Sequence, residues 1–342
     1  MKRTVNIGGK EYGNLWLAPM AGDGDRAFRL VCKRHGAEYM CSEMVSAKAI
    51  CYGDKKTPAL AKITPDEAPM AVQLFGSEPD FMAEAAAKIL EDAKKDGVTP
   101  SAIDINAGCP VHKIVSNGEG SALMKDLDLL GRIVESTVKA SSVPVTVKMR
   151  IGWDLSSINA VEAAKCVEAA GAAAVCVHAR TRSQLYSPGV DISQIKKVKD
   201  AVKIPVIGNG DITTPERAKE CFEQYGVDAV MIGRATFGCP WIFEDVRCHL
   251  EGKPRPARTM AWCMDVLREH VERSIEWVGD ERKGIVHSRR HFAASPILKG
   301  LPDFRQTRIR LLRADTKEEV FDIMDEIVRV YGAMFDAMEH DR

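Results

Sequence analysis

Eight short runs of apolar and small residues recur along the first 240 or so residues, and a stretch with helical periodicity follows each. Several runs are continuously apolar, as strands buried on both faces are. They are Leu15–Pro19, Glu38–Ser42, Met70–Phe75, Ala102–Asn106, Pro144–Met149, Ala174–His178, Pro205–Gly208 and Ala229–Ile232. This number of strands in about 240 residues predicts an α/β fold, a (β/α)8 TIM barrel. A doubly wound sheet is the alternative, although no point where the strand order reverses is evident.

Local signals mark the helices between these runs. Helical stretches are expected at Asp80–Lys94 and at Ile158–Ala170, where Gly171 is typical of a helix end. Thr214 followed by Pro215 is typical of a helix start. These signals support an alternation of strand and helix.

The pattern changes near Trp241. Residues 252–256 resemble a linker, and beyond them only helical stretches are found, at Thr259–Trp277 and Lys317–Met338. We therefore expect a catalytic barrel domain over residues 1–250 and a smaller C-terminal helical domain over residues 251–342.

Composition narrows the classes of function. The 48 basic and 48 acidic residues cancel, so contact with nucleic acid must come from local patches. No two of the ten cysteines have Cys-x-x-Cys spacing, so we expect no metal. The longest apolar stretch, residues 169–177, is too short to span a bilayer, and the first residues lack the apolar run of a signal peptide. We expect a cytoplasmic protein that does not bind membranes.

Polar residues stand at the carboxyl ends of the predicted strands, where barrels bind their ligands. Gln73, Asn106 or His178 taken singly could simply hold loop backbone or sit in the core. Lys148 is different, because burying an unpaired ammonium group within residues 145–150 would be costly. Because the carboxyl ends of all eight strands lie at the same rim of a barrel, polar residues at these positions predict a ligand site there.

The last two strand ends indicate a phosphate. Loops after strands seven and eight commonly form the phosphate site of such barrels. Here they contain Asn209, Gly210 and Asp211, then Gly233 and Arg234. Glycines let backbone N–H groups approach a phosphate closely, and a guanidinium group can pair with it through two hydrogen bonds.

An ordered set of motifs resembles one known family, the tRNA-dihydrouridine synthases, and most closely the bacterial B-type enzymes. The matching segments are residues 17–22 (LAPMAG), 72–76 (VQLFG), 104–110 (DINAGCP), 120–123 (GSAL), 147–153 (VKMRIGW), 177–182 (VHARTR), 208–212 (GNGDI), 232–235 (IGRA) and 240–243 (PWIF). Ala107 and Ala179 depart from the family pattern, but both are small residues.

The resemblance implies FMN as the cofactor, NADPH as its reductant and a uridine of tRNA as the substrate. By analogy, the flavin is expected to contact Pro19, Met20, Ala21, Gln73, Lys148 and His178. Its phosphate is expected at Asn209, Gly210, Asp211, Gly233 and Arg234. Reduction of the C5–C6 double bond of uracil needs a hydride and then a proton on the adjacent carbon.

The resemblance also assigns residues to the substrate. Cys109 would be the proton donor, and a thiol is mostly protonated near neutral pH. Asn106 and Arg150 would grip the uracil, and Arg180 and Tyr186 would be further contacts on the substrate side.

Residues 281–313 contain nine Lys or Arg and two acidic residues, which predicts a basic surface. Such a run is usually a solvated helical face, but beside a barrel that acts on tRNA it predicts contact with RNA phosphates. We expect Arg289 and Arg290 to take part, and we expect a monomer. Two alternatives stay open. One is an FMN barrel that acts on a free pyrimidine such as dihydroorotate, and the other is a flavin-free tRNA-binding module.

Overall fold

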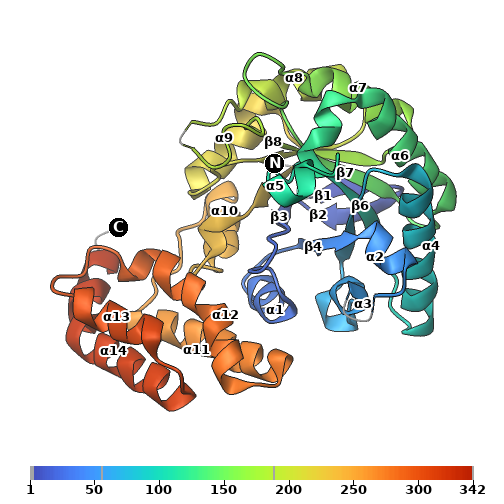
Figure 1. Ribbon diagram of the computed structural model, residues 1–342. Coiled ribbons are helices and arrows are strands. Elements are labelled where there is room, and N and C mark those ends of the chain that lie inside the picture. Colours follow the sequence, from blue (N-terminus) through green and yellow to red (C-terminus); the bar gives the residue numbers. More distant parts are fainter. Residues whose placement is uncertain (1–3, 55–56, 188, 341–342) are drawn as a thin grey trace. The chain divides into compact units, whose positions relative to one another are not determined.

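The computed structural model describes residues 4–54, 57–187 and 189–340 of the chain. Eight parallel strands close into a barrel in the order β10-β3-β4-β5-β6-β7-β8-β9. Figure 1 shows this barrel with helices around it. They are β3 (Leu15–Leu17), β4 (Tyr39–Ser46), β5 (Met70–Phe75), β6 (Ala102–Ala107), β7 (Val145–Arg150), β8 (Ala174–His178), β9 (Val206–Asn209) and β10 (Ala229–Ile232). The predicted TIM barrel is confirmed. The doubly wound alternative is wrong, because β10 pairs with β3 and leaves no open edge.

Helices connect the strands of the barrel. They are α2 (Ala47–Cys51), α3 (Thr57–Ala61), η1 (Pro65–Glu67), α4 (Pro79–Lys95), α5 (His112–Val115), η2 (Gly120–Lys125), α6 (Leu127–Ala140), α7 (Ala160–Ala169), α8 (Ser193–Ala201) and α9 (Pro215–Tyr225). Helix α9 begins as predicted, with the Thr214 side chain accepting a hydrogen bond from the Arg217 backbone N–H. Strand β4 is longer than expected and has a register shift between Cys41 and Met44.

An N-terminal hairpin, β1 (Thr4–Ile7) and β2 (Lys10–Gly13), precedes the barrel and was not predicted. Val5 and Ile7 are buried in one cluster with the first inward side chains of several barrel strands, which are Tyr39, Ala102, Ala174 and Ala229. The hairpin therefore covers the amino-terminal end of the barrel. Its turn, Gly8-Gly9, has positive φ at both residues, which is the short-hairpin signal that the sequence already contained.

The chain divides into two compact units. The barrel unit contains the residues up to Ala21 and residues Ala37–Gly233, whereas the helical unit contains Gly22–Gly36 and the residues from Arg234 on. The helical unit comprises α1 (Arg26–Arg34), η3 (Arg234–Thr236), α10 (Ile242–Leu250), α11 (Met260–Val278), α12 (Glu281–Ala294), η4 (Pro296–Leu298), α13 (Arg305–Arg313) and α14 (Lys317–His340). The expected helical C-terminal region is confirmed, and it groups with α1 from the first crossover. A functional boundary near residue 250 stays a prediction.

No helix within the described residues is both long and apolar enough to cross a membrane. The same residues contain no group of three or more His, Cys, Asp or Glu side chains arranged to hold a metal ion.

Candidate active site

Strand register gathers the predicted site residues of the barrel unit at the carboxyl ends of the strands. Asn106 on β6 is paired with Lys148 on β7, and His178 on β8 is paired with Asn209 on β9. Side chains of a strand point alternately inward and outward, so every second residue faces the barrel interior. Gln73, Asn106, Lys148, His178 and Asn209 occupy such alternate positions next to the carboxyl ends.

A buried polar chain links the ends of β5 and β6. The Gln73 amide donates to the Asp104 carboxylate at 2.7 Å, and the Asn106 amide donates to the Gln73 amide oxygen at 2.8 Å. Thr146 donates to the second Asp104 oxygen. Burial raises the pKa of Asp104, although these hydrogen bonds counteract it. Sequence reasoning missed Asp104, whose signal was a single acidic residue inside the apolar run 102–105.

The loop that carries Cys109 is held at four backbone atoms. The Asn106 side-chain oxygen accepts the N–H groups of Gly108 and Cys109 at 3.0 and 2.9 Å. Arg150 Nε donates to the Gly108 carbonyl at 2.9 Å. The Ser121 backbone N–H and hydroxyl both donate to the Cys109 carbonyl, at 3.0 and 2.8 Å. Residues from three segments therefore fix the position of Cys109. Sequence reasoning gave Ser121 no role, although it lies in the GSAL motif.

Burial sets the protonation state of Cys109. Loss of hydration raises the pKa of the thiol, and the Val111 backbone N–H, Arg150 and Lys148 lower it by less. Near neutral pH the group is therefore a protonated thiol, which can donate a proton.

Lys148 is half-buried on β7, and its ammonium group donates to the Asn209 side-chain oxygen at 3.0 Å. Asn209 in turn donates to the Met231 carbonyl at 2.7 Å, which fixes its orientation. Within residues 4–54, 57–187 and 189–340, no carboxylate pairs with Lys148. The Asp104 carboxyl interacts with its charge only at longer range, and a half-buried cation without a direct ion pair favours an anionic group beside it.

Arg150 and Arg180 are almost fully buried. Besides Gly108, Arg150 donates to the carbonyls of Thr181 and Leu185 in the loop after β8. Arg180 pairs with the Asp211 carboxylate and donates to the Ser187 carbonyl at 2.9 Å. Both residues, which we expected to contact substrate, thus also hold the loops around the site. Tyr186 is 56% exposed, with its ring centroid 5.7 Å from the Arg150 guanidinium carbon.

Glycines line the expected phosphate loops. A Cβ atom on Gly210 would approach His178 to 3.0 Å, and Gly210 has a φ of +122°. A Cβ on Gly233 would lie 3.4 Å from Ala18 and 3.6 Å from the Met20 sulfur. Pro19, Met20 and Ala21 directly follow β3, so they lie at the same end of the barrel as Gly233.

Three predicted residues belong to the helical unit. Arg234 begins η3, directly after Gly233. Arg289 on α12 donates to the Ala314 carbonyl and pairs with Asp315 at 2.7 Å. Arg290 is exposed and pairs with Asp23 at 2.9 Å.

Comparisons with known proteins identify the family of this chain. The sequence model of the dihydrouridine synthase family matches residues 16–329. The chain belongs to the dihydrouridine synthase family. A probable tRNA-dihydrouridine synthase of Rickettsia bellii is 39% identical over 96% of this chain and 98% of its own length. tRNA-dihydrouridine synthase B of Pseudomonas aeruginosa is 39% identical over 92% of this chain and 93% of its own.

Solved structures share the fold of this dihydrouridine synthase at low identity. A variant of NCR from Zymomonas mobilis has a TM-score of 0.53 at 18% identity, covering 76% of this chain and 94% of its own. Histamine dehydrogenase from Rhizobium sp. 4-9 has a TM-score of 0.53 at 14% identity, covering 79% of this chain and 50% of its own. At these identities the likeness shows the fold alone.

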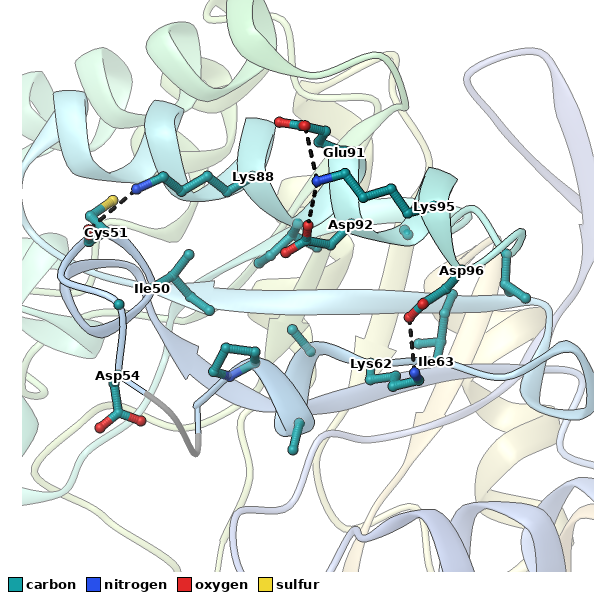
Figure 2. A pocket seen from close by; sticks show the side chains of 17 residues that line it. Ile50, Cys51, Asp54, Lys62, Ile63, Lys88, Glu91, Asp92, Lys95 and Asp96 are labelled. Atoms are coloured by element: carbon teal, nitrogen blue, oxygen red, sulfur yellow. Dashed lines mark hydrogen bonds and ion pairs between the residues drawn. The ribbon is translucent and has the colours of Figure 1, made fainter.

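The dihydrouridine synthase chain also has a cavity of about 700 Å³ between the α2–α3 segment and α4 (Figure 2). The candidate site residues do not line it. Its lysines already have partners: Lys95 contacts Glu91 and Asp92, and Lys62 contacts Asp96 at 3.1 Å. Since its charges are neutralised locally, we do not place the reaction there.

Proposed function

We propose that this protein reduces the C5–C6 double bond of specific uridines in tRNA, with FMN as the cofactor and NADPH as the reductant. The observation that carries the proposal is the presence of two functional groups at the same end of the barrel. A fixed, protonated Cys109 lies on the loop after β6, and Lys148 on β7 makes no direct ion pair with a carboxylate within the described residues.

The residues of the rim fit a flavin. Lys148 offers a cation to an electron-rich ring system, and Gln73 and His178 provide further polar contacts nearby. Gly210 has a positive φ and leaves no room for a Cβ beside His178, and neither Gly210 nor Gly233 has a side chain that would keep a phosphate from the backbone N–H groups. The Asp211 carboxylate forms an ion pair with Arg180, so Asp211 would bind the phosphate through its backbone N–H rather than through its side chain. Asn209, Pro19, Met20, Ala21 and Arg234 complete the proposed set.

Reduced FMN, when bound, would supply the hydride. The Cys109 thiol then delivers a proton to the adjacent ring carbon, because burial keeps it protonated and its loop is fixed at four backbone atoms. Asn106 and Arg150 lie beside this loop and would hold the uracil. Arg180 and Tyr186 would act further out on the substrate side.

The substrate is proposed from chemistry and from relatives. The compared relatives are named for tRNA, and they match the chain over nearly their whole length. In the helical unit, eight of the nine basic residues of positions 281–313 are exposed, and the ninth, Arg289, is half-buried. This surface, including Arg289 and Arg290, would contact tRNA phosphates. We further propose that the protein acts as a monomer in the cytoplasm.

A reconstitution experiment tests the proposal. Purified protein should carry FMN and, with NADPH, form dihydrouridine in tRNA taken from a strain that lacks this gene. Colourless protein would contradict the cofactor assignment. Turnover of free uracil or dihydroorotate at the rate found with tRNA would contradict the substrate assignment and favour the alternative FMN barrel.

A further inference from the structure

Three side chains that have no role in the proposed reaction form a stack in the barrel unit. The Lys125 ammonium nitrogen lies 4.4 Å from the centroid of the Trp153 ring, and the Arg182 guanidinium carbon lies 4.6 Å from it. Lys125 ends η2, Trp153 follows β7 and Arg182 follows β8. All three therefore belong to the carboxyl-end loops of neighbouring strands, on the rim that carries Cys109.

Hydrogen bonds brace the three segments. The Arg182 N–H donates to the Gly152 carbonyl and the Ser183 N–H to the Trp153 carbonyl, each at 2.9 Å. The Asn159 side chain donates to the Met124 carbonyl at 2.7 Å, which ties the end of η2 to the loop after β7. These hydrogen bonds between the loops therefore keep the three side chains of the stack close together.

Neither cation of the stack has a carboxylate partner among residues 4–54, 57–187 and 189–340. The acids next to them in sequence are engaged elsewhere: Asp126 accepts from the Leu129 N–H, and Asp154 accepts from Ser156 and Ser157. In addition, Arg182 Nε is buried without an acceptor. The exposed ammonium group of Lys125 and the half-buried guanidinium group of Arg182 therefore have no counter-ion within the described residues, which favours an anion supplied from outside the chain.

The segment that ends at Lys125 also holds Cys109 in place. Ser121, four residues earlier in η2, donates to the Cys109 carbonyl. A 3₁₀ helix rises about 2 Å per residue, so Lys125 lies roughly 8 Å further along η2. A polymer that places one base beside Cys109 would bring its neighbouring phosphates to this part of the rim.

We propose that Lys125, Trp153 and Arg182 form a binding site for the phosphates that flank the target uridine in RNA. This inference rests on the proposed function. Because two cations already lie over its ring, Trp153 holds these cations through cation–π contacts and does not offer its face for stacking on a base. Its ring holds the two cations in place, so less side-chain entropy is lost when a phosphate binds.

Salt-dependent binding of tRNA to the flavin-loaded protein tests the site. Losing one phosphate contact removes about 0.7–0.9 from the slope of log K against log salt concentration, which is about five- to eightfold in affinity at 0.1 M salt. We expect this loss for Lys125→Gln and for Arg182→Gln, and a smaller weakening for Trp153→Leu. Lys139→Gln is the matched control, because Lys139 is an exposed lysine in the last turn of α6, at the opposite end of the barrel.

NADPH also carries phosphates, so its KM is measured for the same variants and should not change. A rise in the KM for NADPH with unchanged tRNA affinity would show that the stack serves the coenzyme, and the RNA assignment would be wrong. Wild-type affinity and salt slope in Lys125→Gln, an exposed position that should not affect folding, would also overturn it. Failure of the proposed function differs from both, because the wild type itself would then form no dihydrouridine.

Discussion

The barrel unit and the helical unit place their polar side chains in opposite ways. In the barrel unit, Gln73, Asp104 and Asn106 are buried and bonded to one another at the strand ends. In the helical unit, the basic residues of α12 and α13, apart from the half-buried Arg289, face solvent around an apolar and aromatic core. The contrast suggests that the barrel unit arranges reacting groups, whereas the helical unit presents charge.

Burial shifts pKa values in both units, but it does so for different kinds of side chain. It raises the pKa of both Cys109 and Asp104 in the barrel unit, and for Cys109 this keeps the thiol protonated near neutral pH. In the helical unit it lowers the pKa of His270 to about 4 and also lowers that of His291. The imidazoles pack together, with ring centroids 4.3 Å apart. The neutral thiol is useful as an acid, whereas the neutral imidazoles make the helical unit sensitive to acid.

The largest expected effect concerns the barrel unit alone. Cys109→Ala removes the proposed proton donor, and general acid catalysis contributes roughly 10²–10⁴-fold. Dihydrouridine formation should fall by that factor in single-turnover measurements, while FMN content and tRNA affinity stay at the wild-type level. Cys166→Ala, at another half-buried cysteine on α7, is the control. Full activity in Cys109→Ala would exclude Cys109 as the acid.

The second prediction concerns the helical unit and acid. An imidazole has an unperturbed pKa of about 6.5, so the unfolded chain takes up protons before folded His270 does. Stability is therefore present above pH 6.5 and is lost as the pH falls through 4, by about 3 kcal/mol for His270. Urea unfolding at pH 7 and pH 4 measures this loss. The loss should shrink in His270→Phe, and an unchanged pH dependence would contradict the assignment.

The third prediction separates packing in the helical unit from chemistry in the barrel unit. A Cβ on Gly284 of α12 would lie 2.5 Å from the Cα of Ile275 on α11, so Gly284→Ala must push these helices apart. We expect a loss of about 1–3 kcal/mol in the free energy of unfolding and weaker tRNA binding, with FMN retained. Gly332→Ala on α14 is the matched control. Its Cβ would meet nothing closer than 3.8 Å, so unchanged or slightly higher stability is expected.

The smallest effect should come from the support of the Cys109 loop. Ser121→Ala removes the hydroxyl bond to the Cys109 carbonyl but keeps the backbone bond, a change of about 0.5–1.5 kcal/mol. We expect kcat to fall by about two- to tenfold with little change in the KM for tRNA. The opposite pattern, a raised KM at constant kcat, would mean that Ser121 serves binding and not the placement of Cys109.

The raised pKa of Cys109 also predicts how kcat depends on pH. Because burial raises its pKa, the thiol stays protonated above the range in which a free thiol ionises. The alkaline limb of the kcat profile should therefore lie above a pH of about 8.5. A limb at or below that value would show that another group limits the reaction.

Much of the barrel was predictable because its signals are local. Continuous apolar runs mark strands buried on both faces, and Thr214 with Pro215 marks a helix start that the structure confirms. The hairpin at Gly8-Gly9 carried an equally local signal that was overlooked. By contrast, nothing local indicated that α1, from the first crossover of the barrel, groups with the C-terminal helices. That grouping depends on packing between segments more than 200 residues apart.

The sequence by itself determined the eight barrel strands and their order, the family and the list of residues at the strand ends, because periodicity and motifs are properties of neighbouring residues. Only the tertiary structure decided which of those residues contact one another. It links Arg150 to Gly108, Ser121 to Cys109 and Arg182 to Trp153. Closing the barrel brings together loops distant in the chain, and burial among them sets the protonation of Cys109.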